Sequence, residues 1–149
     1  FESGGSPLHI GEKDERLLPR DKASRARANR WMFAALNSME PFVQMLFMIG
    51  FVADGTDWQQ AGKDSIRPFA RMRLGQLARA LGEREWLEDR FTIGDLLMID
   101  VLRAVPEMEL VAEHPNLAAC LARGTARPAF KAAMAAQLAA FERHAPVAA

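Results

Sequence analysis

The stretch Phe91-Thr92-Ile93-Gly94-Asp95-Leu96 decides the fold of this 149-residue chain. A threonine hydroxyl just before a helix accepts a hydrogen bond from a backbone N–H of the first turn, and a carboxylate three residues later accepts one from the threonine N–H. Thr92 and Asp95 have this spacing, with Asp in place of the usual Glu or Gln. Phe91 and Leu96 occupy the two positions of the apolar contact that accompanies such a cap. The stretch predicts a structural capping box at Thr92 and Asp95 and a helix that begins at Ile93.

The helix that follows this cap is apolar on nearly every side, through Leu96-Leu97-Met98-Ile99-Asp100-Val101-Leu102. A helix without a polar face is surrounded by other elements. We therefore expect a buried central helix.

The rest of the chain predicts further helices around it. Ala occurs 26 times, whereas Val, Ile and Thr together number 14 and Tyr is absent, a balance that favours helix over strand. Apolar spacings of three and four predict helices over 22–51, capped by Asp21, and over 63–81, ended by Gly82, with two more over 116–123 and 128–143. In the last, Phe130, Met134, Leu138 and Phe141 are expected to point inward. The fold class is all-α, an irregular orthogonal helical bundle around a buried central helix.

Two stripes run along the predicted helix 22–51. One is almost entirely apolar and contains Met32, Leu36, Met39, Val43, Leu46 and Gly50. The other has polar groups between aromatic ends and reads Phe33, Asn37, Glu40, Gln44, Phe47 and Phe51. Pro41 lacks a backbone donor and should distort the helix near 37–40. The mixed stripe fits a solvated helix face and a small-molecule cleft about equally well.

Several function classes have little support. The three histidines lie far apart without a second ligand nearby, which argues against a metal site, and Cys120 fits a small core residue. Basic and acidic residues balance at 19 each, which argues against nucleic acid as a partner. No uninterrupted apolar run approaches about 20 residues, so no membrane span is expected. A single cysteine fits a reducing cytoplasm.

A basic cluster lies around the start of the helix 22–51. Its members are Arg16, Arg20, Lys22, Arg25, Arg27 and Arg30. Positive charge in the first turns of a helix opposes the helix dipole. We expect anionic partners outside this helix, in a dimer interface or an anionic ligand.

Taken together, these segments resemble the C-terminal helical domain of cytosolic, bacterial-type glutathione transferases. The resemblance rests on Arg90 to Asp95 as the capping box before the buried helix, on Asn29-Arg30-Trp31 and Glu40-Pro41-Phe42 in the long helix, and on Arg127-Pro128 at the last one. Glu2-Ser3 is similar to the acidic-Ser pair that binds glutathione at the end of the family's thioredoxin-like domain. Gly94 departs from the family's usual Ala, at a helix cost of up to about 1 kcal/mol.

The resemblance implies a division of the chain and a function. Residues 1–16 correspond to the tail of the thioredoxin-like domain, 17–21 to the linker, and 22–149 to the helical domain. The implied activity is conjugation of glutathione, as co-substrate, to small hydrophobic electrophiles, in a cytoplasmic homodimer that serves detoxification without a metal. Glu2 and Ser3 would bind glutathione, and the electrophile would contact Phe33, Asn37, Glu40, Gln44 and Phe47.

No catalytic residue is assigned within this chain. The Tyr, Ser or Cys that activates the glutathione thiol in the family lies near the start of the thioredoxin-like domain, before the segment that Glu2 resembles. The alternative is a non-catalytic helical module used for assembly or for ligand binding. The residues that precede Phe1 would distinguish the two.

Overall fold

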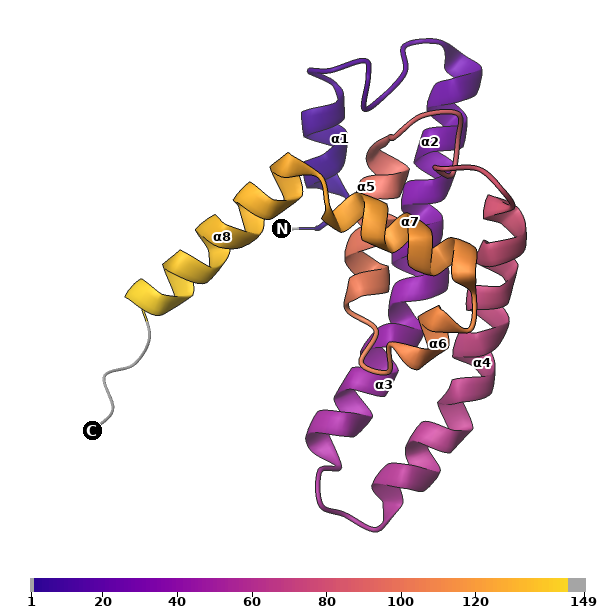
Figure 1. Ribbon diagram of the computed structural model, residues 1–149, viewed down its shortest axis with the longest axis vertical. Helices are drawn as coiled ribbons and strands as arrows, with labels where there is room; N and C mark the ends of the chain where they lie inside the picture. The colour runs from indigo at the N-terminus through magenta and orange to yellow at the C-terminus, as the bar shows by residue number, and fades with distance from the viewer. Residues whose placement is uncertain (1, 145–149) are drawn as a thin grey trace.

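The computed structural model describes residues 2–144, and these form helices only, with no strand among them. In chain order the helices are α1 (Gly5–Gly11), α2 (Lys22–Ala34), the π-helical turn η1 (Ala35–Met39), α3 (Glu40–Val52), α4 (Trp58–Leu81), α5 (Ile93–Arg103), α6 (Glu109–Ala112), α7 (Pro115–Thr125) and α8 (Pro128–Arg143). Figure 1 shows α2, α3 and α4 as a long hairpin, with α5 and α7 packed across its upper half. The predicted all-helical bundle is confirmed.

One continuous helical rod is formed by α2, η1 and α3. The Asp21 side chain accepts a hydrogen bond from Ser24 N at 2.9 Å, as expected for the predicted cap. The predicted distortion near Pro41 takes the form of η1, whose wider turn accommodates a residue that cannot donate a backbone hydrogen bond. The buried residues of the rod include Met32, Met39 and Leu46, so most of the predicted apolar stripe is buried.

By length and composition alone, this rod could also cross a membrane. Lys22–Val52 contains an 18-residue window of mean hydropathy 1.3, of which 17% is buried. The count of uninterrupted apolar residues missed this window because Asn37, Glu40 and Gln44 interrupt the run. One such helix is weak support for a span, because core helices of other proteins have the same composition.

The long helix α4 begins at Trp58, earlier than the predicted Lys63, because its first turn is anchored to the end of α3. Gln59 Nε2 donates to the carbonyl of Gly50 at 3.0 Å. Farther along the hairpin, the rings of Phe42 and Phe69 stack with centroids 6.1 Å apart. The helix ends at Gly82, which has φ +60° and fulfils the predicted C-terminal stop.

The central helix α5 begins as predicted. Thr92 Oγ1 accepts from Gly94 N at 3.2 Å, and Asp95 Oδ2 accepts from Thr92 N at 2.9 Å, so the capping box is confirmed. Asp95 Oδ1 also accepts from Leu87 N at 2.8 Å, which ties the preceding loop to the helix. Burial raises the pKa of the Asp95 carboxyl, while the hydrogen bonds from Leu87 and Thr92 oppose that shift.

Gly94 is explained by the packing of α5 on α2. A Cβ at this position would lie 2.5 Å from the Cβ of Trp31 and 3.1 Å from the carbonyl oxygen of Ala28. The two helices approach so closely that a methyl group has no room. Glycine has a lower helix propensity than alanine, but only glycine allows α2 to pack this closely against the central helix.

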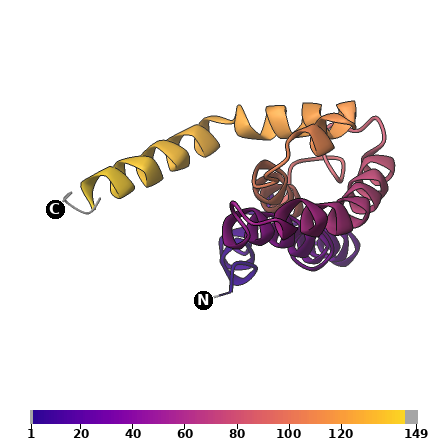
Figure 2. The same cartoon turned by 90° about the horizontal axis from the view of Figure 1, so that it is seen from below.

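The last helix, α8, differs from its prediction. It has no buried residue, and it extends away from the bundle (Figures 1 and 2). Leu138 is 56% exposed and Phe141 is 68% exposed, so the prediction that they point inward is wrong for the chain as described. Their apolar stripe exists, but no element of the described chain packs against its outer half.

Candidate functional site

The first wall of the site is the turn that leads into α1. Glu2 has φ +68°, a left-handed backbone conformation that residues other than glycine rarely adopt. Its carbonyl accepts a hydrogen bond from Gly5 N at 3.0 Å, which closes a tight turn around Ser3 and Gly4. Strain of this kind concentrates at functional sites. The backbone thus holds Ser3 at an exposed corner in a fixed conformation.

The second wall comes from the end of α2 and from η1. Phe33 is 55% exposed, and Asn37 Nδ2 donates to the Phe33 carbonyl at 3.2 Å. This bond uses one donor of the Asn37 amide and fixes the position of its side chain. Glu40 follows at the junction of η1 and α3 and is half-buried. Local π-helical turns are frequent at functional sites because they change the direction of side chains.

The two walls enclose an open cleft of about 410 Å³. Its lining contains Glu2, Ser3, Gly4, Gly5, Leu8, Met32, Phe33, Leu36, Asn37 and Glu40. The structure therefore brings together five of the seven predicted ligand-binding residues, from segments more than 29 positions apart in sequence. The lining combines apolar side chains with a serine, an amide and two carboxylates, and it includes no Lys, Arg or His. Few polar groups on apolar walls are typical of a small-molecule site.

Gln44 and Phe47 do not line this cleft. Both are exposed farther along α3, and the Phe47 ring stacks on Phe51 with centroids 6.3 Å apart. Glu40 is the last residue of the rod that lines the cleft, and the opposite wall consists only of residues between Glu2 and Leu8. Gln44 and Phe47 lie about 6 and 10 Å farther along the helix, at 1.5 Å per residue, and are beyond this wall.

Sequence reasoning missed the remaining lining residues, Gly4, Leu8 and Leu36 among them. The segment 4–7 has turn-forming composition, yet Ser6 and Pro7 lie in the first turn of α1, where proline is tolerated. Leu36 belongs to the stripe predicted to be fully apolar, but it is half-buried and contributes to the cleft. The sequence signal that could have predicted α1 is Pro7, a residue tolerated in the first turn of a helix, followed by the apolar Leu8.

The chain's one thiol lies elsewhere. Cys120 is 4% exposed within α7, and burial raises its pKa to about 11. A thiol in this state is a poor nucleophile at neutral pH. Across residues 2–144, no group of three His, Cys, Asp or Glu side chains is arranged to hold a metal ion.

The basic cluster has anionic partners outside the helix, as expected, but the partners that the structure describes belong to the same chain and not to a second subunit or a ligand. Arg25 pairs with Glu12, and Arg27 Nε lies 2.8 Å from Glu88 Oε2. Glu88 also accepts from Trp31 Nε1 at 2.7 Å. These contacts join α2 to α1 and to the loop before α5, across separations in sequence that helical periodicity cannot detect. The cluster therefore stabilises the position of the cleft wall.

No family model and no curated protein match the sequence. Solved structures do match. A glutathione transferase from Burkholderia graminis, with two glutathione molecules bound per subunit, is 27% identical with a TM-score of 0.75, and the match covers 87% of this chain and 57% of that one. One from Pseudomonas putida, with one glutathione disulfide bound per subunit, is 25% identical with a TM-score of 0.76, covering 88% of this chain and 60% of that one.

A third match has the same extent. A glutathione transferase family member from Pseudomonas fluorescens, with two glutathione bound, is 26% identical with a TM-score of 0.78, covering 87% of this chain and 60% of that one. The fold is therefore shared over most of the present chain. The chain spans about three fifths of the length of each of these proteins.

Proposed function

We propose that the cleft between α1 and η1 binds glutathione and a hydrophobic electrophile for conjugation. The premise is that this chain belongs to the glutathione transferase family and forms its C-terminal-type helical domain. The observation that carries the proposal is the convergence of Glu2 and Ser3 with Phe33, Asn37 and Glu40 on one cleft. Structures of similar proteins with glutathione or its disulfide bound support the choice of co-substrate.

Each wall has its own role in this proposal. The Ser3 hydroxyl and the backbone of the strained turn hold one end of the tripeptide through hydrogen bonds. Phe33, with Met32 and Leu36 behind it, provides apolar contact for the electrophile. Asn37 and Glu40 orient the electrophile because their polar groups lie at the rim of the same cleft.

Activation of the thiol is a role that we assign to no residue of this cleft, because Ser3 holds one end of the tripeptide in this proposal. Conjugation needs glutathione as a thiolate, and a hydrogen-bond donor held at the sulfur lowers its pKa. The chain has no Tyr, and Cys120 is buried away from the cleft. We infer that residues 1–16 continue a thioredoxin-like domain that precedes Phe1 and carries the activating residue, that 17–21 link it to the helical domain, and that no metal takes part.

The finer features of the protein are also proposals. We infer a cytoplasmic, detoxifying homodimer that binds neither nucleic acid nor membrane. The exposed apolar side chains of α3, which include Met45, Met48 and Val52, support a protein contact on the hairpin.

The test uses the longer protein, expressed with the residues that precede Phe1, and the aryl halide 1-chloro-2,4-dinitrobenzene as electrophile. Asn37→Ala and Glu40→Ala should change kcat/KM severalfold and leave the free energy of unfolding within about 0.5 kcal/mol, because Asn37 is exposed, Glu40 is only half-buried, and polar groups outside the core contribute little to stability. Ser38→Ala is the matched control, since Ser38 lies next to Asn37 but lines a separate cavity with Trp31 and Arg73.

Met39→Ala is expected to change stability, in contrast to the two cleft variants, which are expected to change kinetics. Met39 is 5% exposed, so its truncation should lower the free energy of unfolding by roughly 2 to 5 kcal/mol through a cavity. Unchanged kinetics in both Asn37→Ala and Glu40→Ala would refute the cleft as the electrophile site. Absence of turnover in the longer wild-type protein would instead favour the non-catalytic module.

A further inference from the structure

Glu40 is a carboxylate of the cleft that has no cationic partner. It is half-buried at the start of α3 and lines the cleft together with Phe33 and Asn37. None of the ion pairs among residues 2–144 includes Glu40 or Glu2, the second carboxylate of the lining. The two walls therefore carry two negative charges that no ion pair within the described chain compensates.

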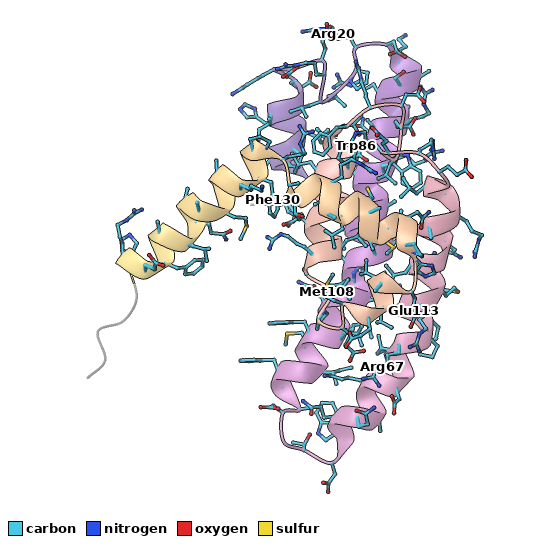
Figure 3. The ribbon with its side chains drawn as sticks, viewed as in Figure 1. Arg20, Arg67, Trp86, Met108, Glu113 and Phe130 are labelled. Atoms are coloured by element: carbon cyan, nitrogen blue, oxygen red, sulfur yellow. The ribbon has the colours of Figure 1, made fainter. Side chains whose placement is uncertain are left out.

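The basic side chains of the chain lie elsewhere. Figure 3 shows Arg20 at the top of the molecule and Arg67 in its lower half, whereas the start of α1, where the cleft lies, is between them in height. Both arginines have carboxylate partners of their own, Glu15 at 3.3 Å and Glu107 at 2.7 Å. A ligand with a positive charge would therefore meet uncompensated carboxylates in this cleft and no competing cation among its lining residues.

Glutathione can compensate one of the two carboxylates. The tripeptide has a single ammonium group, on its γ-glutamyl end, and its glycine end carries only a carboxylate. Glu2 precedes Ser3, which holds one end of the tripeptide in the proposed function, and charge complementarity favours the ammonium end beside Glu2. Glu40 lies on the opposite wall, next to the residues that contact the electrophile. Its charge therefore acts on the electrophile.

Phe33 acts in the same direction as Glu40. Its ring is 55% exposed on the same wall of the cleft. The face of an aromatic ring attracts a cation, and quaternary ammonium groups are often recognised in this way. A partly buried charge is also screened less by salt than an exposed one. An anionic group at this position would be repelled by Glu40 and would gain nothing from the ring.

We propose that Glu40 makes the electrophile site selective for charge, so that it prefers apolar electrophiles with a cationic group over neutral ones and discriminates against anionic ones. The reaction rests on the proposed function, but the charge preference is a property of the 149-residue chain itself. In the reaction the glutathione thiolate forms the C–S bond, and chloride leaves with the electron pair of the C–Cl bond. Glu40 takes no part in these bond changes and acts only as a specificity-determining residue.

Three electrophiles of similar size and different charge test the preference. They are amides of 4-chloro-3-nitrobenzoic acid whose nitrogen carries a 2-(trimethylammonio)ethyl, a 3,3-dimethylbutyl or a 2-sulfoethyl group, which are a cation, its neutral isostere and an anion. For the longer protein, kcat/KM divided by the uncatalysed rate constant should decrease in this order. The cation and the anion should differ by about tenfold, as expected for one partly screened charge pair. Raising the ionic strength should narrow the difference.

Variants of Glu40 identify the group that sets the order. Glu40→Gln should bring the three normalised rates together, and Glu40→Lys should reverse their order. Glu83→Gln is the matched control, because it removes the same charge from an exposed position outside the cleft and should keep the wild-type order. An order that Glu40→Gln retains would overturn the proposal, as would equal normalised rates in the wild type.

A binding experiment needs no turnover. Millimolar benzyltrimethylammonium should shift the amide resonances of Phe33, Asn37 and Glu40 in the ¹⁵N-labelled 149-residue chain, whereas the anion phenylmethanesulfonate should not. In Glu40→Gln the two probes should behave alike. Failure of conjugation with this difference intact would refute the proposed function and support the charge preference. Conjugation of all three amides at equal normalised rates would overturn the charge preference and leave the proposed function standing.

Discussion

Replacing Gly94 by alanine should destabilise the domain, although alanine is the better helix former. The new Cβ would lie 2.5 Å from the Cβ of Trp31 and 3.1 Å from the carbonyl oxygen of Ala28. Neither atom is the end of a flexible side chain, so α2 and α5 must separate. Overpacking costs typically about 1 to 3 kcal/mol, and a contact this short belongs at the upper end. The helix propensity gained by alanine offsets about 1 kcal/mol.

The expected net loss is therefore about 2 kcal/mol in the free energy of unfolding, or roughly 5 °C in Tm for a chain of this size. Gly75→Ala is the matched control on α4. A Cβ there meets only Arg79 Nη1 at 3.6 Å and His114 Cε1 at 3.8 Å, which are ordinary contacts. It should stabilise the domain by about 0.5 to 1 kcal/mol, through propensity and a less flexible unfolded chain.

Urea unfolding followed by far-UV circular dichroism measures both changes. The close approach of α2 and α5 at Gly94, and its absence at Gly75, require shifts of opposite sign for the same chemical substitution. If both variants gained stability, the close approach of α2 and α5 would be refuted, and with it the position of the cleft wall that α2 carries.

Three further predictions concern the cap, an ion pair and the activity. Thr92→Ala should lower the free energy of unfolding by about 1 kcal/mol, and an unchanged urea midpoint would show that the capping box is not formed. Arg67 holds the pKa of Glu107 below its ordinary value of 4.5 through hydrogen bonds at 2.7 and 2.8 Å. A carboxyl with a lowered pKa in the folded state stabilises above its unfolded pKa, and this stabilisation is lost as the pH falls through the folded value. Glu107→Gln should therefore lower stability at neutral pH, and the difference from wild type should shrink as the pH falls through the lowered pKa of Glu107; a difference independent of pH would contradict the pair. The 149-residue chain alone should show negligible conjugation of 1-chloro-2,4-dinitrobenzene, and robust turnover would require a thiol-activating group within it.

The features that local sequence determines were predictable. The cap at Thr92 and Asp95 depends on residues three positions apart, and the burial of α5 follows from its composition. Pro41 predicted a distortion, because a missing donor acts on its own helix. Glu2 and Ser3 could be paired with Phe33, Asn37 and Glu40 only through a family resemblance, since nothing in their spacing brings them together.

The features that the sequence could not predict depend on the type of distortion and on distant partners. A kink and a π-turn have the same sequence signal at Pro41. The length of the opposite wall, Glu2 to Leu8, decides that the cleft ends at Glu40 and does not reach Gln44 and Phe47. The stripe of α8 has the same periodicity whether it faces its own bundle or another segment. The partners of Arg27 and Arg30 lie at Glu88, far along the chain.

The most direct test of the account is an NMR titration of the ¹⁵N-labelled 149-residue chain with millimolar S-hexylglutathione, a ligand that carries both the tripeptide and an apolar substituent. We expect weak binding, with the largest amide shifts at Ser3, Gly4, Phe33 and Asn37, and no comparable shift at Phe47 or along α8. The absence of shifts at the cleft, or larger shifts along α8, would contradict this expectation.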